Sequence, residues 1–334
     1  MKKVTIADVA AHANVSKSTV SQYLNERYDY MGEATKAKVK QAIEELGYQP
    51  NFVARSLKQK STKTIGVIVA NILHTFSTEV SRAIEDVCNE EGFHTIVCNA
   101  DDDPDKEKKY IEMLRAKQVD GLIVFPTGNN RDLYRKMVEE SYPIILLDRW
   151  FSDIEIPAVM LENELASKLA VEHFVDRGYQ KIGLITTSIL EHITPRQERV
   201  NGFEKGMAEH NLPIPDHFVQ SVAKERIQAA LDEMLSYTDR PDAIIAGNDL
   251  VLTEILKYVK QQQLTIPEDL ALIGIDDVPY ASFYTPAITT VAQPTFKMGK
   301  MSAELLLKKI LNKTVDASTN EIRFQPTLMV RDSV

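Results

Sequence analysis

The sequence predicts an α/β protein in which a small all-helical module precedes two doubly wound lobes, each built on a parallel sheet. From residue 63 onward, apolar β-branched runs such as Ile65–Val69 alternate with amphipathic stretches of helical period, as expected of βαβ units with right-handed crossovers. The pattern also repeats, since residues 63–68 are echoed by 180–185 and residues 119–123 by 241–245, at offsets of 117 and 122 residues. Two similar lobes explain a repeat of this size.

The composition is that of a globular protein of two or three domains. The chain has 334 residues, of which 44% are hydrophobic and 26% charged, and a domain usually holds about 100–200 residues. No apolar run approaches the ~18 residues of a membrane helix, and an acid at position 8 argues against a secretory signal. Cys88 and Cys98 fit neither a disulfide scaffold nor a zinc spacing. We therefore expect a cytoplasmic protein with no metal, no cofactor and no membrane partner.

Charge is distributed unevenly along the chain. Residues 1–62 hold ten basic and six acidic groups, a balance of +4, whereas the other 272 residues hold 29 basic and 42 acidic groups, a balance of −13. A basic module on an acidic carrier is typical of a protein that binds a polyanion with one part only. Chance is the alternative explanation, because +4 on 62 residues is a modest excess.

The basic module has the pattern of a helix-turn-helix. Thr5 and Asp8 form a capping box, Asn14 suits a tight turn, and Ser16 can cap a second helix. The first predicted helix begins at Ile6, the second spans Lys17 to Leu24, and the third spans about Glu33 to Leu46. The first residues of the second helix in such a motif reach base edges in the major groove. The alternative is a solvated three-helix bundle without a DNA role.

The run VTIADVAAHANVSKSTVSQYLN, from Val4 to Asn25, resembles the headpiece of the lactose/galactose-repressor (LacI/GalR) family, as do residues 47–51 and 53–57. The resemblance covers nearly the whole chain, and it implies that Lys17, Ser18 and Gln22 read bases. Gln can pair with adenine and Lys with guanine. Gln22 stands where many members carry Arg, and Gly32 stands where Ser usually caps the third helix. The operator bases are therefore expected to differ from the usual ones.

The resemblance further implies that residues 50–62 form a hinge helix that folds only on DNA, with Ala54 and Leu57 entering the minor groove. A disordered tether is the alternative, because two helical turns are too few to be stable alone. The candidate DNA-contacting residues are Thr5, Ser16, Lys17, Ser18, Thr19, Ser21, Gln22, Asn25, Tyr48, Asn51, Val53, Ala54, Leu57 and Lys58.

The resemblance divides the chain into a headpiece (1–49), the hinge (50–62) and a bilobed effector-binding and dimerisation domain (63–334) like a periplasmic binding protein. The first lobe takes about 63–160 plus 295–325, and the second takes about 161–294 plus 326–334. Within the first lobe, helices are predicted at about Glu79 to Glu91, Pro104 to Ala116 and Asp132 to Glu139. Strands are predicted there at Thr95 to Cys98, Gly121 to Phe125 and Ile144 to Leu147.

Polar side chains follow several predicted strands, and the carboxyl ends of parallel strands line a cleft between two lobes. The candidate effector-binding residues are Asn71, His74, Phe76, Asp148, Arg149, Trp150, Arg196, Arg199, Asn248, Asp276 and Phe283. Asp and Asn can bind sugar hydroxyls, Arg can bind hydroxyl pairs or a carboxylate, and the aromatic rings can pack on a sugar face. The resemblance implies effector contacts for Asp148, Arg199, Asn248 and Asp276; helix capping is the alternative for the Asp and Asn residues taken singly.

These observations predict a DNA-binding transcription regulator, with repression the expected mode. It would act as a homodimer on a pseudo-palindromic double-stranded operator, with a small effector in the cleft. The arginines and His74 favour a sugar acid of the hexuronate or 2-keto-3-deoxygluconate type or a phosphorylated sugar, and a neutral sugar stays open. The competing hypotheses are a sugar-binding receptor without a DNA role and an enzyme. No GxxxxGK[ST], HExxH or GxSxG motif occurs, so we expect no catalytic residues and no enzymatic activity.

Overall fold

A computed structural model describes residues 4–29, 31–49, 61–188, 194–311 and 320–334 of the chain. It divides into two compact units, Met1–Thr62 and Lys63–Val334. Among the described residues, no helix is long and apolar enough to cross a bilayer.

The first unit contains the three predicted helices, α1 (Ile6–His12), α2 (Lys17–Leu24) and α3 (Glu33–Leu46). The capping box is present, since the Thr5 amide donates to the Asp8 carboxylate at 2.8 Å. Asn14 has a φ of 51° at the turn, and Gly47 ends α3 with a φ of 57°, a left-handed conformation that glycine adopts without strain. The helices enclose one small core, made of Val9, Ala10, Ala13, Val20, Val39 and Ala42. The predicted start of α1 and the predicted bounds of α2 and α3 are confirmed.

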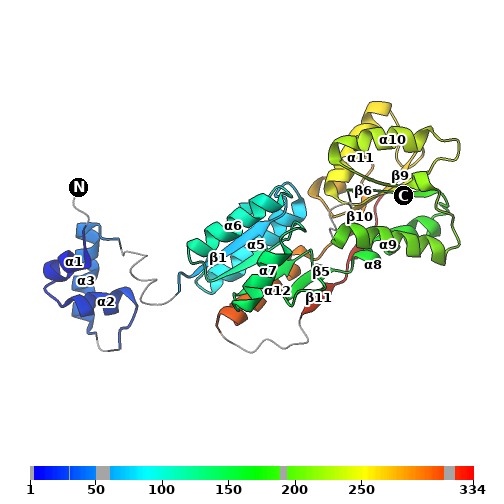
Figure 1. The fold of residues 1–334 in the computed structure, drawn as a ribbon. Coiled ribbons are helices and arrows are strands. Elements are labelled where there is room, and N and C mark those ends of the chain that lie inside the picture. The colour runs from blue at the N-terminus through cyan, green and yellow to red at the C-terminus, as the bar shows by residue number, and fades with distance from the viewer. Residues whose placement is uncertain (1–3, 30, 50–60, 189–193, 312–319) are drawn as a thin grey trace. The chain divides into compact units, whose positions relative to one another are not determined.

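The second unit holds two six-stranded sheets (Figure 1). The strands of the first sheet, in spatial order, are β11 (Glu321–Phe324), β5 (Ala158–Leu161), β4 (Ile144–Leu147), β3 (Gly121–Val124), β1 (Thr64–Val69) and β2 (His94–Asn99). The strands of the second sheet are β12 (Thr327–Met329), β10 (Thr289–Ala292), β9 (Ala271–Ile275), β8 (Ala243–Ala246), β6 (Ile182–Thr187) and β7 (Val219–Val222). All neighbours pair in parallel except β10 and β12. The two orders match strand for strand, which explains the internal repeat of the sequence.

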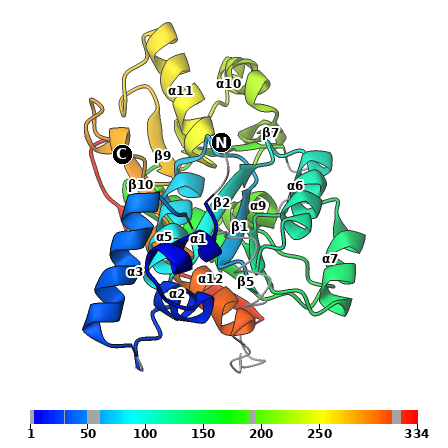
Figure 2. The same ribbon diagram turned by 90° about the vertical axis from the view of Figure 1, so that its left-hand side faces the viewer.

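Helices cover both faces of each sheet, as the continuous apolar strands require. In the first lobe, α5 and α12 share a core with one face of the sheet, and α6 and α7 share a core with the other (Figure 2). In the second lobe, α8 and α9 cover one face, and α10 and α11 cover the other (Figure 1). Their bounds are α5 (Thr75–Glu90), α6 (Pro104–Ala116), α7 (Arg131–Glu139), α8 (Asn163–Asp176), α9 (Thr194–Glu209), α10 (Ile227–Ser236), α11 (Asp249–Gln262) and α12 (Thr295–Ile310).

The chain passes between the two sheets three times: from β5 to α8, from β10 to α12, and from β11 to β12. α12 follows the last long strand of the second sheet but packs on α5 and on β3, β4 and β5 of the first lobe. The two lobes are therefore joined by three short connections that lie close to the strand ends.

One helix boundary was predicted wrongly. α5 begins at Thr75, whereas the sequence pattern placed its start at about Glu79. The His74 side chain gives α5 no N-terminal cap; instead, the Thr75 amide donates to a carboxylate oxygen of Asp249 at 2.7 Å. A cap supplied from 174 residues away leaves no signal in the local sequence.

Candidate functional site

The exposed face of α2 carries the predicted base-reading residues. Lys17, Ser18 and Gln22 are exposed, while Val20 is fully buried in the headpiece core. Ser16 caps the helix by accepting from the Thr19 amide at 3.1 Å. The helix therefore presents a lysine, a hydroxyl and an amide to solvent on a rigid support, which is the arrangement that groove reading needs.

The other headpiece candidates have mixed surroundings. Thr5 is exposed but bound to Asp8, Tyr48 packs against the headpiece core, and Asn25 donates to the Ser21 carbonyl at 2.6 Å. The hydroxyl oxygens of Ser16 and Thr19 lie 2.8 Å apart, within hydrogen-bond distance. The hinge candidates lie outside the described residues: Asn51, Val53, Ala54, Leu57 and Lys58.

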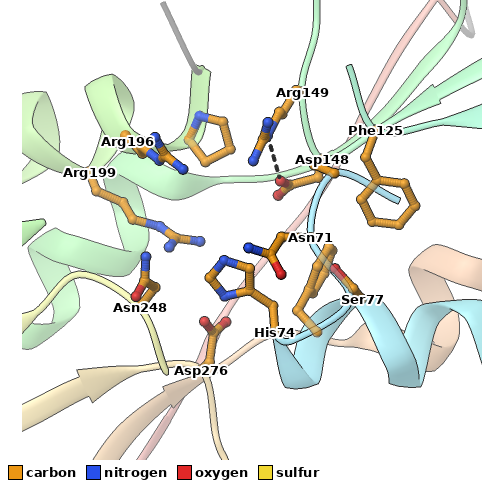
Figure 3. Close-up of a pocket in the computed structure, with 13 residues that line it drawn as sticks. Asn71, His74, Ser77, Phe125, Asp148, Arg149, Arg196, Arg199, Asn248 and Asp276 are labelled. Atoms are coloured by element: carbon orange, nitrogen blue, oxygen red, sulfur yellow. Dashed lines mark ion pairs between the residues drawn. The ribbon is translucent and has the colours of Figure 1, made fainter. Parts of the chain in front are cut away.

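A cavity lies between the two lobes (Figure 3). Its lining residues are Ala70, Asn71, His74, Phe76, Ser77, Phe125, Asp148, Arg149, Pro195, Arg196, Arg199, Asn248 and Asp276. Nine of the eleven predicted effector residues are among them, and Trp150 and Phe283 are not. Phe283 is 75% exposed, and the Trp150 amide donates to the Thr194 hydroxyl at 3.3 Å beside the cavity.

Arg149 is buried at the end of β4 and is only partly satisfied. Its Nη1 donates to the Pro126 carbonyl at 3.1 Å and its Nη2 to Asp102 at 2.8 Å. Its Nε has no hydrogen-bond partner and lies 3.7 Å from the Asp148 carboxylate. A buried donor without an acceptor is costly, and the Asp148 carboxylate is the charged group beside it.

Asp102 lies in an acidic run, 101–103, whose other two members are exposed, but Asp102 itself is partly buried. Its side chain is 22% exposed and pairs with Arg149, and Arg196 Nη2 lies 3.9 Å away. Burial acts to raise the pKa of Asp102, but the two arginines outweigh it and hold the pKa below its usual value. The neighbouring Asp103 caps α6. No cluster of three or more metal-ligating side chains occurs among the described residues.

Arg199 and Arg196 come from α9 and reach the cavity from the second lobe (Figure 3). Arg199 is 5% exposed; its Nε donates to Asn163 Oδ1 at 3.0 Å and its Nη1 to the Gly247 carbonyl at 2.7 Å. Arg196 Nη1 donates to the Ser188 carbonyl at 2.8 Å. Backbone and side-chain acceptors thus fix both guanidinium groups before any ligand arrives.

Two aspartates face these arginines across the cavity. Burial raises the pKa of Asp148 and of Asp276; Arg149 and Arg199 partly offset this for Asp148, and Arg199 does so for Asp276. Gln293 donates to Asp276 at 2.5 Å. Asn248 both caps a helix and lines the cavity. Its Oδ1 accepts from the Val251 amide at 2.9 Å at the start of α11, and the residue is part of the cavity lining.

The lobes meet at Asp249, a residue that the sequence placed beside Asn248 without assigning it a role. Its carboxylate lies 2.5 Å from His74 Nδ1 and accepts from the Thr75 amide at 2.7 Å. Burial acts to raise the pKa of Asp249, but these contacts outweigh burial and hold the pKa below its usual value. One nitrogen of His74 is therefore committed to the contact between the lobes.

Sequence reasoning missed four lining residues and one supporting residue. Ala70, Ser77, Phe125 and Pro195 line the cavity, and Asn163 holds Arg199. Phe125 ends the predicted strand 121–125, so the rule that ligands lie beyond strand ends already pointed to it. Its ring meets Phe76 edge to face, with centroids 6.0 Å apart.

Comparisons with known proteins agree with this arrangement. The family model of bacterial regulatory proteins, lacI family, matches residues 5–51, and a periplasmic binding protein-like domain model matches residues 171–334. A probable HTH-type transcriptional regulator, EndR of Paenibacillus polymyxa, is 48% identical over 333 residues, covering 99% of this chain and 98% of the relative. The chain belongs to the lacI family of bacterial regulatory proteins.

Further relatives of this lacI-family chain are also transcription regulators rather than enzymes. The HTH-type transcriptional regulator KdgR of Bacillus subtilis (strain 168) is 36% identical over 309 residues, covering 92% of this chain and 91% of the relative. A crystal structure of the Lac repressor bound to ONPG in the repressed state superposes with a TM-score of 0.87 at 24% identity, over 100% of both chains. The bilobed lacI-family fold with its helix-turn-helix is thus established for this protein, which is a DNA-binding transcription regulator.

Proposed function

We propose that this lacI-family regulator reads its operator with Lys17, Ser18 and Gln22, and that a sugar acid in the interlobe cavity sets its operator affinity. The observation that carries the effector proposal is the convergence of three arginines with two aspartates and Asn248 on one cavity. The regulator acts as a homodimer on a pseudo-palindromic operator, with residues 50–62 as the hinge segment.

The chemistry of the cavity favours an anion that also bears hydroxyl groups. The lining carries three arginines against two aspartates, and the buried Nε of Arg149 lacks an acceptor. A carboxylate supplies that acceptor and pairs with guanidinium groups in a fork. Asp148 and Asp276 accept from sugar hydroxyls, and the Phe76–Phe125 pair offers an apolar surface for a ring face.

Calorimetric titration of the full chain tests the effector class. D-galacturonate, D-glucuronate and 2-keto-3-deoxygluconate are compared with D-galactose and D-glucose, and we expect an acid to bind and its neutral counterpart to bind at least about tenfold more weakly. Arg149→Gln should abolish that preference, whereas Arg82→Gln, at an exposed pair with Asp86 on α5, should leave it unchanged. Tighter binding of a neutral sugar contradicts the proposal.

Gel shifts on the upstream DNA of the chain's own gene, at two salt concentrations, test the reading residues. We expect binding that weakens steeply with salt, a loss of about 1–3 kcal/mol with relaxed base preference for Lys17→Ala, and little change for the exposed Lys38→Ala. Leu57→Ala should largely lose specific binding. Full operator affinity in the Leu57 variant refutes the hinge assignment, and unchanged affinity and base preference in the Lys17 variant refute its reading role.

A further inference from the structure

A chain of polar contacts behind the cavity joins Arg199 to the connections between the lobes. It runs from Arg199 through Asn163 and Glu198 to Arg323. Asn163 is fully buried and is the first residue of α8, directly after the crossover from β5. Arg199 therefore takes its orientation from a residue that lies at the joint of the two lobes.

The Glu198 carboxylate decides which way the Asn163 amide faces. Asn163 Nδ2 donates to Glu198 Oε2 at 3.0 Å and to the Leu161 carbonyl at 3.3 Å. Carboxylate and carbonyl oxygens only accept, so Nδ2 must face them and Oδ1 is left to accept from Arg199 Nε. If the amide were reversed, Nδ2 would meet the guanidinium, and two donors would face each other.

Arg323 in turn holds Glu198 from the other lobe. Its Nη2 lies 2.7 Å from Glu198 Oε1 and its Nη1 lies 3.1 Å from Oε2, a fork in which both oxygens are bound. Nη1 also donates to the Leu161 carbonyl at 3.1 Å. Arg323 belongs to β11 of the first sheet and Glu198 to α9 of the second lobe, so this ion pair spans the joint. The two side chains are only 21% and 16% exposed, so water screens the pair weakly.

We propose that Asn163, Glu198 and Arg323 are positioning residues that orient Arg199 for the effector and tie that orientation to the angle between the lobes. The proposal rests on the proposed function, in which Arg199 binds the effector. A rotation of the lobes that separates Arg323 from Glu198 removes the fork that fixes the Glu198 carboxylate, and so weakens the contact that orients the Asn163 amide toward Arg199 Nε. Effector affinity and lobe angle are coupled through this one contact.

The variant Glu198→Gln tests the proposal, because it keeps the size of the side chain while its amide can both donate and accept. The control is Glu164→Gln, which removes an exposed partner of Lys205 at 2.6 Å between the same two helices, α8 and α9. In crystals of the full chain without effector, Arg199 should lose its Asn163 contact in the first variant and keep it in the control. Affinity for D-galacturonate should fall about tenfold in the first and stay within about twofold in the control.

A conservative change separates positioning from general stabilisation. Arg323→Lys keeps the charge but loses the fork, so its affinity for D-galacturonate should lie between those of the unaltered chain and Arg323→Gln. If Arg199 keeps both contacts in Glu198→Gln, or if the variants lower Tm without changing affinity, the residues are merely structural and the proposal is overturned. If the unaltered chain binds no sugar acid, the effector class is wrong, and the crystal structures still decide whether Glu198 positions Arg199.

Discussion

The headpiece and the effector cavity differ in the range of the polar contacts that shape them. In the headpiece, the capping contacts of α1 and α2 join residues three or four positions apart, as with Thr5 and Asp8 or Asn25 and Ser21, and the longer contact from His12 reaches only 33 positions, to Glu45. In the cavity, Arg149 binds Asp102 from 47 positions away, and His74 binds Asp249 from 175 positions away. The helix caps of the first region are specified by neighbours in sequence, whereas the second region exists only once the lobes have folded and met.

Gly202→Ala should give the largest effect and should be confined to the second unit. A Cβ at Gly202 would lie 2.2 Å from the Glu164 carbonyl oxygen, so α8 and α9 would have to separate. We expect a loss of about 3 kcal/mol in the free energy of unfolding. Hydrogen exchange of the full chain should show faster exchange across 163–209 and unchanged exchange across 6–46.

The control for this prediction is Glu204→Ala, at an exposed position two residues along the same helix, which should change little. Equal loss of protection in the headpiece would show that the two units do not unfold independently.

Asp148→Asn should give the next effect, and it should depend on pH. Burial raises the pKa of Asp148, so the folded state favours its protonated form and the ionised form costs stability. That cost is full above the raised pKa and fades as pH falls toward the unfolded value of 3.8. The variant should therefore have a higher Tm than the unaltered chain at pH 7, and the difference should shrink toward pH 4.

Thermal melts across that pH range provide the measurement, with Asp153→Asn as the comparison of opposite sign. Burial acts to raise the pKa of Asp153, but Arg131 and Arg135 outweigh it and hold the pKa below its usual value, so that variant should lower Tm at pH 7. A variant that is less stable at pH 7 would show that the ionised Asp148 is compensated by its arginines. Weaker binding of the effector by the same variant is expected, because Asp148 lines the cavity.

Ser16→Ala should give the smallest effect, confined to the headpiece. It removes the cap at the start of α2, which is worth about 1 kcal/mol. Exchange should quicken in 17–24 alone, operator affinity should drop modestly, and Ser16→Thr should restore both because threonine is also a good cap. A change of similar size in the effector cavity would contradict the local character of the headpiece contacts.

The same contrast explains how far the sequence could predict this protein. The start of α1 and both ends of α2 and α3 were predicted, because caps and turn residues are local signals. The cavity was predicted as a set of polar residues after strand ends, because parallel sheets place those ends together. What each polar group binds could not be predicted: nothing in the sequence indicated that Asp102 pairs with Arg149, and Glu198 received no role. Those partners are set by the packing of the lobes.

The contact between Asp249 and the start of α5 has a further consequence for the motion of the lobes. Any rearrangement that draws the second lobe away strips a sixteen-residue helix of its anionic partner and leaves the Thr75 amide to be rehydrated. The Asp249 carboxylate loses the same hydrogen bond and must be hydrated again while it lies close to Asp276. Separation of the lobes is therefore opposed at both ends of one hydrogen bond, because donor and acceptor must each be hydrated again.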